Sequence, residues 1–297
     1  MGNDNTNNLI SRRHFIGSIV AATTAGAFLK ACTASSPWQI GIYTRPWNQW
    51  DYLVAFDSIA EAGFKYVGLM SQKGGRVIDQ NTTDEKAAII AEEAKSRGLE
   101  IISISGHRFE GEKPIDENVA SLKKLIDNAV ICNCPSLMLN GVSRPEYVDG
   151  YYKVIAEACD YAAEKGIFLN LKPHGGTNAT GVQCRENIAK VGHKNFTLWY
   201  DPGNIYYYSN GEIDPVNDVT NVDGLVKGMC VKDFRMPKDV NVTPGTGMVD
   251  FPKLFERMRQ GGFTGGPLVI ECLNTGEIPY VTAEAKKALE FLEGILA

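Results

Sequence analysis

The chain has 297 residues, of which 44% are hydrophobic and 22% are charged. This composition is typical of a soluble globular protein with a large core, and it argues against disorder away from the chain ends. The formal net charge of −5 provides no broad basic surface, so we do not expect nucleic acid as a partner.

The first 36 residues are typical of an export signal. Arg12 and Arg13 precede an apolar run over 16–29, and adjacent arginines before such a run are the twin-arginine signature. An ordinary secretory signal with two basic residues is the alternative. The apolar run is shorter than the roughly 20 residues that span a bilayer as a helix. We therefore assign residues 1–36 to a leader and expect an exported protein in the periplasm or at the cell envelope.

Cys32 follows Leu29-Lys30-Ala31, which resembles a lipoprotein processing box except that Lys30 stands where a small or apolar residue is usual. A lipid anchor at Cys32 stays open, and it is the only membrane contact that we expect. Cleavage there leaves about 265 residues, close to the roughly 250 of one (β/α)8 barrel. We expect most of the remaining cysteines to be small core residues: Cys132, Cys134, Cys159, Cys184, Cys230 and Cys272.

After the leader, short apolar runs alternate with longer amphipathic stretches, which is the pattern of repeated βα units around a parallel sheet. No linker rich in Pro, Gly or Ser divides the chain. Residues 37–297 are therefore predicted to form a single (β/α)8 TIM barrel of the α/β class, with an open doubly wound sheet as the alternative. The eight predicted strands are 39–44, 66–70, 100–105, 136–140, 167–174, 196–201, 228–234 and 267–273.

The helical stretches carry their own start and stop signals. Thr82 and Glu85 have the spacing of a capping box, and Gly98 is the expected C-terminal glycine of the helix that follows. Other helices are expected to begin near Asp51, Asp116, Pro145 and Asp250.

Polar residues at the carboxyl ends of the strands are the candidate site, because (β/α)8 enzymes gather their reactive groups there. A single histidine at a strand end is usually structural, but His107 and His174 occupy equivalent places. Glu271 directly follows three apolar residues, and burying a carboxylate there requires a cation, hydrogen-bond donors or a metal. The candidates are Arg45, the loop 72–76, His107, Asn140, Lys172, His174, Asp201, Asn204, Lys232, Asp233, Arg235 and Glu271.

Five segments carry a resemblance to the xylose isomerase-like barrel superfamily of sugar isomerases, epimerases and dehydratases. Their order along the chain is more specific than any one of them, and the resemblance extends over about the whole mature chain. The segments are Leu169-Asn170-Leu171-Lys172-Pro173-His174, Tyr200-Asp201-Pro202-Gly203-Asn204, Cys230-Val231-Lys232-Asp233, Pro244-Gly245-Thr246-Gly247 with Val249-Asp250-Phe251, and Gly262-Phe263 leading to Ile270-Glu271.

The resemblance implies a divalent ion held by a glutamate ending strand five, an aspartate ending strand six, a histidine on strand seven and a glutamate ending strand eight. Asp201 and Glu271 match the second and fourth ligands, whereas the first falls on Lys172 and the third on Cys230. A lysine ammonium has no free lone pair and repels a nearby cation. This departure puts the usual metal site in question.

Two interpretations of the site remain open. In one, Asp201, Glu271, His174 and His107 bind Mn²⁺, Zn²⁺ or Mg²⁺ in an altered arrangement. In the other, Lys172 replaces the ion and neutralises both carboxylates. We expect a divalent metal cofactor slightly more than its replacement by lysine.

Reactions of the superfamily mostly begin with removal of a proton from the carbon beside a carbonyl, which gives an enediolate that a cation stabilises. The resemblance thus implies an isomerase or epimerase acting on a keto-sugar or a sugar derivative. Glu271 is the expected base or ligand, and Lys172, His174 and Lys232 are expected to stabilise the oxyanion or transfer protons. The predicted substrate contacts are His107, Asn140, Asn204, Arg45 and Arg235.

Two other functions stay open. One is a lyase that acts on 3-keto-glycosides through Lys172, and the other is a barrel that binds a carbohydrate without turnover. Export favours free or glycosidic sugars over sugar phosphates as the small-molecule partner. Nothing in the sequence indicates an oligomeric state.

Overall fold

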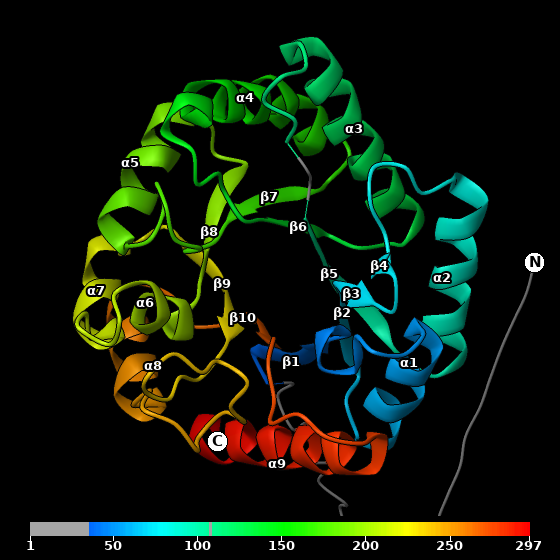
Figure 1. Ribbon diagram of the computed structural model, residues 1–297, viewed down its shortest axis with the longest axis vertical. Coiled ribbons are helices and arrows are strands. Elements are labelled where there is room, and N and C mark those ends of the chain that lie inside the picture. The colour runs from blue at the N-terminus through cyan, green and yellow to red at the C-terminus, as the bar shows by residue number, and fades with distance from the viewer. Residues whose placement is uncertain (1–35, 107–108) are drawn as a thin grey trace, which may run out of the picture. The chain divides into compact units, whose positions relative to one another are not determined.

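A closed barrel of eight parallel strands forms the centre of the computed structural model, which describes residues 36–106 and 109–297 (Figure 1). Around the barrel the strands follow the order β1-β10-β9-β8-β7-β6-β5-β2. This closure confirms the predicted (β/α)8 barrel and excludes the open doubly wound sheet. The strands are β1 (Trp38–Tyr43), β2 (Tyr66–Leu69), β5 (Glu100–Ser105), β6 (Ser136–Leu139), β7 (Phe168–Leu171), β8 (Phe196–Tyr200), β9 (Val226–Val231) and β10 (Gly266–Ile270).

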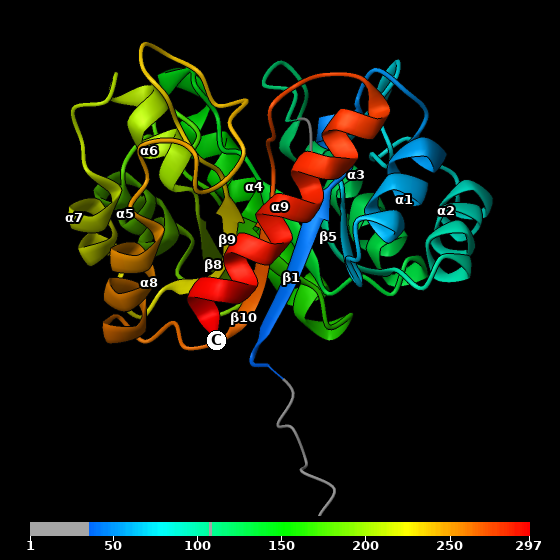
Figure 2. The ribbon, with the colours of Figure 1, turned by 90° about the horizontal axis from the view of Figure 1, so that it is seen from below.

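Helices surround the barrel, and α9 crosses the outer face of β1 (Figure 2). No helix of the described residues has the length and apolar character needed to cross a bilayer. The α-helices are α1 (Tyr52–Glu61), α2 (Asp84–Ser96), α3 (Ile115–Ile131), α4 (Val148–Glu164), α5 (Gly181–Val191), α6 (Pro202–Tyr208), α7 (Pro215–Asp218), α8 (Phe251–Gln260) and α9 (Ile278–Leu296), and the 3₁₀ helices are η1 (Arg45–Trp47), η2 (Pro145–Tyr147) and η3 (Val219–Val222).

The predicted helix starts are mostly confirmed, but the predicted capping box is wrong, because the helix begins one residue later and Lys86 stands where a capping box needs Glu or Gln. The N-cap of α2 is Thr83, whose hydroxyl accepts the Lys86 N–H at 3.3 Å. The Thr82 hydroxyl is engaged elsewhere, because it accepts the Asp79 N–H at 3.0 Å. Gly98 has the positive φ of +72° expected of a glycine just after a helix.

Seven of the eight predicted strands run past the point where the structure ends them, three of them by three residues, and β7 shows why. Pro173 has no N–H to donate, and the His174 N–H bonds to the Asn178 carbonyl at 3.0 Å instead of to a neighbouring strand. The chain therefore leaves the sheet after Leu171. The loop 72–76 also contains a short antiparallel hairpin, β3 (Ser71–Gln72) with β4 (Gly75–Arg76), that the sequence pattern did not predict.

The inside of the barrel is filled by one side chain from most of the strands. These form a buried cluster of Tyr43, Met70, Ile102, Met138, Trp199, Cys230 and Val269. A second, larger cluster lies between the sheet and the helices. The six cysteines of the described residues are buried and free of disulfides, in agreement with their expected role as core residues.

Some predictions concern residues outside the described part. Arg12, Arg13 and Cys32 carry the expectations of export and lipid attachment, and His107 is a candidate site residue. All four lie outside the residues that the structure describes.

Candidate active site

Strand alternation places the candidate residues at the mouth of the barrel. Side chains two positions apart on a strand point to the same side, so the residues that follow Trp199, Cys230 and Val269 by two also point inward. These are Asp201, Lys232 and Glu271. Because Val231 pairs with Ile270 in the register of β9 and β10, Lys232 and Glu271 lie next to each other.

A cavity of about 490 Å³ opens at this end of the barrel, within the size range of small-molecule sites. It brings together nine of the residues predicted from the sequence, two of them from the loop 72–76: Arg45, Gly75, Arg76, Asn140, Lys172, His174, Asn204, Lys232 and Glu271. It is also lined by Met70, Ser71, Ser105, Tyr207, Tyr208 and Val240. Tyr207 and Tyr208 were missed, although they are the last two residues of the helix that Asp201 begins.

Two lysines and two carboxylates form a buried ion-pair network under the cavity. The Nζ of Lys232 lies 3.0 Å from Asp201 Oδ2 and 2.8 Å from Glu271 Oε1. The Nζ of Lys172 lies 3.2 Å from Asp201 Oδ2 and also contacts Glu271 Oε2. None of the four residues is more than 4% exposed. Two positive and two negative charges therefore compensate one another where burial makes an unpaired charge costly.

The segment from Asp201 to Asn204 begins a helix. Asp201 is the N-cap of α6, and its Oδ1 accepts the Asn204 N–H at 3.0 Å. The Asn204 side chain accepts from Lys232 at 3.0 Å and donates to the Pro173 carbonyl at 2.7 Å. A Cβ on Gly203 would lie 2.6 Å from Lys232 Cγ. Glycine is therefore needed here for the Lys232 side chain to lie so close to the backbone of α6.

Asp233 does not pair with Lys232, although their adjacency allowed it. Its carboxylate accepts four backbone N–H groups, from Phe234 at 2.8 Å, Gly245 at 3.0 Å, Gly247 at 2.8 Å and Val249 at 3.0 Å. These bonds hold the loop 244–249 in place beside the mouth. None of the residues of that loop lines the cavity, whereas Val240 from the preceding segment does.

The electrostatics of the network keep its groups charged. Burial alone raises the pKa of Glu271, but Lys172, Lys232 and Arg45 outweigh it and hold that pKa well below the usual range. Burial lowers the pKa of Lys172, and Glu271 more than offsets this and raises it. Burial also lowers the pKa of Lys232, and the charges of Asp201 and Glu271 more than offset this and raise it. At neutral pH Glu271 is therefore ionised and both lysines are protonated.

His174 lines the cavity as a neutral imidazole. Burial, together with the positive charges of Lys172 and Lys232, lowers its pKa to about 3. Its ring lies 5.7 Å from the ring of Tyr208. A neutral imidazole offers one N–H donor and one acceptor to a ligand.

Of the other predicted substrate contacts, Arg45 and Asn140 line the cavity and Arg235 does not. Arg45 lines the cavity and its guanidinium contacts the Cys272 thiol. The Oδ1 of Asn140 is buried and has no hydrogen-bond partner among the described residues, so it is available to a ligand hydroxyl. Arg235 is exposed, lies 3.9 Å from Asp239 and does not line the cavity.

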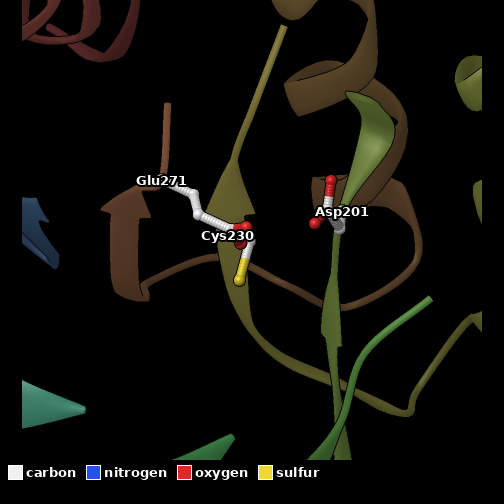
Figure 3. A group of neighbouring side chains, drawn as sticks. All are labelled: Asp201, Cys230 and Glu271. Carbon is white, nitrogen blue, oxygen red and sulfur yellow. The ribbon is translucent and has the colours of Figure 1, made fainter. Parts of the chain in front are cut away.

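The side chains most suited to a metal are Asp201, Cys230 and Glu271, whose ligand atoms lie within 4.8 Å of one another. Figure 3 shows Glu271 reaching from the end of β10 toward Asp201 at the end of β8, with Cys230 on the intervening β9. His174 is not a member of this group. Both carboxylates are bound to ammonium groups, and the Cys230 Sγ lies against Met138 Sδ at 3.0 Å. These residues do not fit a divalent ion as they stand.

Comparison with known proteins places the chain in a family. The model of the xylose isomerase-like TIM barrel family matches residues 56–295. L-ribulose-5-phosphate 3-epimerase UlaE of Salmonella paratyphi A is 31% identical over 102 residues, and the match spans about a third of each chain, 34% in both cases. Inosose dehydratase of Erwinia tasmaniensis is 22% identical over 207 residues, which cover 58% of this chain and 70% of the dehydratase.

Solved structures show the same fold. A xylose isomerase domain protein from Planctomyces limnophilus is 21% identical with a TM-score of 0.65, over 87% of this chain and 96% of the other. D-allulose 3-epimerase from Methylomonas sp. in complex with D-allulose is 18% identical with a TM-score of 0.69, over 87% and 97%. With the closed barrel and the family match, these likenesses show that the chain belongs to the xylose isomerase-like TIM barrel family.

Proposed function

We propose that the protein is an isomerase or epimerase that removes a proton from the carbon beside the carbonyl of a keto-sugar. The observation that carries this proposal is Glu271, the one carboxylate among the described residues that line the cavity, with Lys172 and Lys232 against it. A carboxylate beside fixed cations is suited to accept a proton while the cations stabilise the enediolate that forms. The names of its relatives, several of them sugar epimerases, support the same chemistry.

Binding of the substrate makes Glu271 a better base. In the free protein both lysines stabilise its ionised form and hold its pKa low. When a substrate carbonyl oxygen accepts the free N–H of Lys172, the negative charge that develops on that oxygen offsets part of the positive charge that Glu271 experiences. The carboxylate then becomes more basic at the moment when the substrate is in place.

The proton balance of the reaction follows from this arrangement. The C–H electron pair moves into the enediolate as the proton passes to a Glu271 oxygen. Return of this proton to the neighbouring carbon, with the hydroxyl proton passing from one oxygen of the enediolate to the other, gives the isomer. Return of a proton to the opposite face of the same carbon gives an epimer and requires a second donor. His174 lines the same cavity but carries no imidazolium proton at neutral pH, because its pKa is lowered to about 3. A protonated lysine of the cavity is therefore the candidate for that donor.

A lyase is the second candidate, because one relative is named a dehydratase. Elimination begins with the same proton removal and then expels a group from the next carbon. The raised pKa of Lys172 disfavours an imine route, since only the neutral amine is nucleophilic. An eliminating enzyme of this geometry would therefore use Glu271 as its base.

Deuterium exchange tests the proposal. The protein is incubated in D₂O with free keto-sugars, their phosphates and 3-keto-glycosides, and products are followed by NMR and mass spectrometry. We expect one deuterium in an epimer, because its new hydrogen comes from a donor that exchanges with solvent, and at most one in an isomer, as far as the proton on Glu271 exchanges before its return. Glu271→Gln should give neither exchange nor product. Loss of water or of an aglycone would support the lyase. Binding without exchange or product for every compound would contradict catalysis and favour a carbohydrate-binding barrel.

A further inference from the structure

We infer that Lys172 and Lys232 take the place of a divalent ion at this site, so that the protein works without a metal. For the catalytic step the inference rests on the proposed function. The claim about metal binding stands on the geometry alone.

The first argument is that all four carboxylate oxygens of Asp201 and Glu271 are already bound. Asp201 Oδ1 accepts the Asn204 N–H at 3.0 Å, and Oδ2 lies 3.0 Å and 3.2 Å from the two lysine Nζ atoms. Glu271 Oε1 lies 2.8 Å from Lys232 Nζ, and Oε2 contacts Lys172. An ion could gain these oxygens only by displacing both ammonium groups.

The second argument is charge. Two ammonium groups and two carboxylates leave no net charge, and all four residues are buried. Metal sites of this kind attract a divalent ion through excess negative charge on the ligands. Here an added ion would meet two positive charges at contact distance and no excess negative charge to offset them.

The third argument distinguishes the roles of the two lysines by comparing their N–H donors with the acceptors around them. A lysine ammonium has three N–H groups. Lys232 has three close acceptors among the described residues, on Asp201, Glu271 and Asn204, all within 3.0 Å. Lys172 has two, on Asp201 and Glu271. Because both lysines line the cavity, the remaining donor of Lys172 is the one available to a substrate carbonyl oxygen.

Lys172 is thus assigned the role of the cation that polarises the substrate. Lys232 holds the two carboxylates together and balances their charge. The carbonyl oxygen accepts the free N–H of Lys172, and the negative charge of the enediolate develops beside that ammonium.

Metal binding tests the inference directly. The full chain is incubated with Mn²⁺ or Zn²⁺, dialysed and measured by elemental analysis. We expect no stoichiometric ion on the natural protein, and deuterium exchange unchanged by a chelator. Lys172→Glu converts the neutral network to a net negative one and should gain one ion per chain. Lys153→Glu makes the same charge change on the exposed face of α4, where the side chain is 63% exposed, and should gain none.

One ion per chain on the natural protein, with activity lost to a chelator and restored by metal, would overturn the inference. If Lys172→Glu does not fold, the natural protein still decides the question, and Lys172→Met provides a second variant. It should lose at least about 100-fold of the exchange rate without a gain from added metal. Absence of exchange with every keto-sugar would defeat the proposed function and leave the metal measurement intact.

Discussion

His174 should make the stability of the fold depend on pH. Its pKa falls from 6.5 to about 3 because burial and the charges of Lys172 and Lys232 disfavour the imidazolium. Below pH 6.5 the unfolded chain binds a proton at this histidine, whereas the folded chain does not. The contribution to stability is therefore fully present above pH 6.5 and is lost as the pH falls toward 3.

The magnitude follows from the shift. Each pH unit below 6.5 lowers the free energy of unfolding by about 1.4 kcal/mol. At pH 5 the loss from His174 alone is about 2 kcal/mol, a large part of a typical total of about 5 to 15 kcal/mol. Most carboxylates remain ionised between pH 8 and pH 5, so histidines dominate the pH dependence in this window.

Urea denaturation at pH 8, 6.5 and 5 measures this loss. His174→Gln keeps a polar side chain of similar size without a titrating group, and it should lose about 2 kcal/mol less than the natural protein between pH 8 and pH 5. The matched control is His193→Gln, because His193 lies at the surface 3.1 Å from Asp160. It should follow the natural protein. Parallel pH profiles for His174→Gln and the natural protein would refute a neutral, buried His174.

Three further substitutions test the supports of the site. Gly203→Ala puts a Cβ 2.6 Å from Lys232 Cγ and should cost about 1 to 3 kcal/mol of stability; an unchanged melting temperature would contradict this close approach. Asp233→Asn replaces an acceptor of four backbone N–H groups and should cost about 1 to 3 kcal/mol, with faster proteolysis of the loop 244–249; equal proteolysis would show that other contacts fix the loop. Asn140→Ala removes a buried acceptor and should weaken binding of the substrate about fivefold, measured by calorimetry, without a change in melting temperature; unchanged affinity would place the substrate elsewhere.

The barrel could be predicted from the sequence because the type and order of its elements follow from local patterns of apolar and polar residues. Apolar runs alternate with amphipathic stretches along the chain, and eight such units in about 260 residues favour a closed barrel. The ends of the elements were less predictable, because they depend on individual side-chain bonds. The engagement of Thr82 with Asp79 and the turn of His174 toward Asn178 are examples that no periodicity reveals.

The convergence of Asp201 and Glu271 was predictable, since both follow parallel strands that end at one mouth. What the two carboxylates bind was not. Sequence order shows that Lys172 stands where the resemblance implies a glutamate, but only coordinates show its Nζ between the two carboxylates. Arg76 was predicted only as part of the loop 72–76, because the hairpin that positions it could not be predicted from the sequence pattern. Tyr207 and Tyr208 were not predicted, because α6 rather than a strand end brings them to the cavity.

The four charges should behave as one unit, and a double-mutant cycle tests this. Lys172→Met leaves one excess negative charge in the buried network, and Glu271→Gln leaves one excess positive charge. Each should cost about 3 to 5 kcal/mol. The double variant leaves Lys232 paired with Asp201 at 3.0 Å and restores neutrality, so it should cost less than the sum of the singles by at least about 1 kcal/mol. Unfolding free energies that simply add would show that Lys172 and Glu271 are not coupled. In that case the charge balance that excludes a metal would lose its basis, because a lysine that does not compensate the glutamate cannot replace an ion beside it.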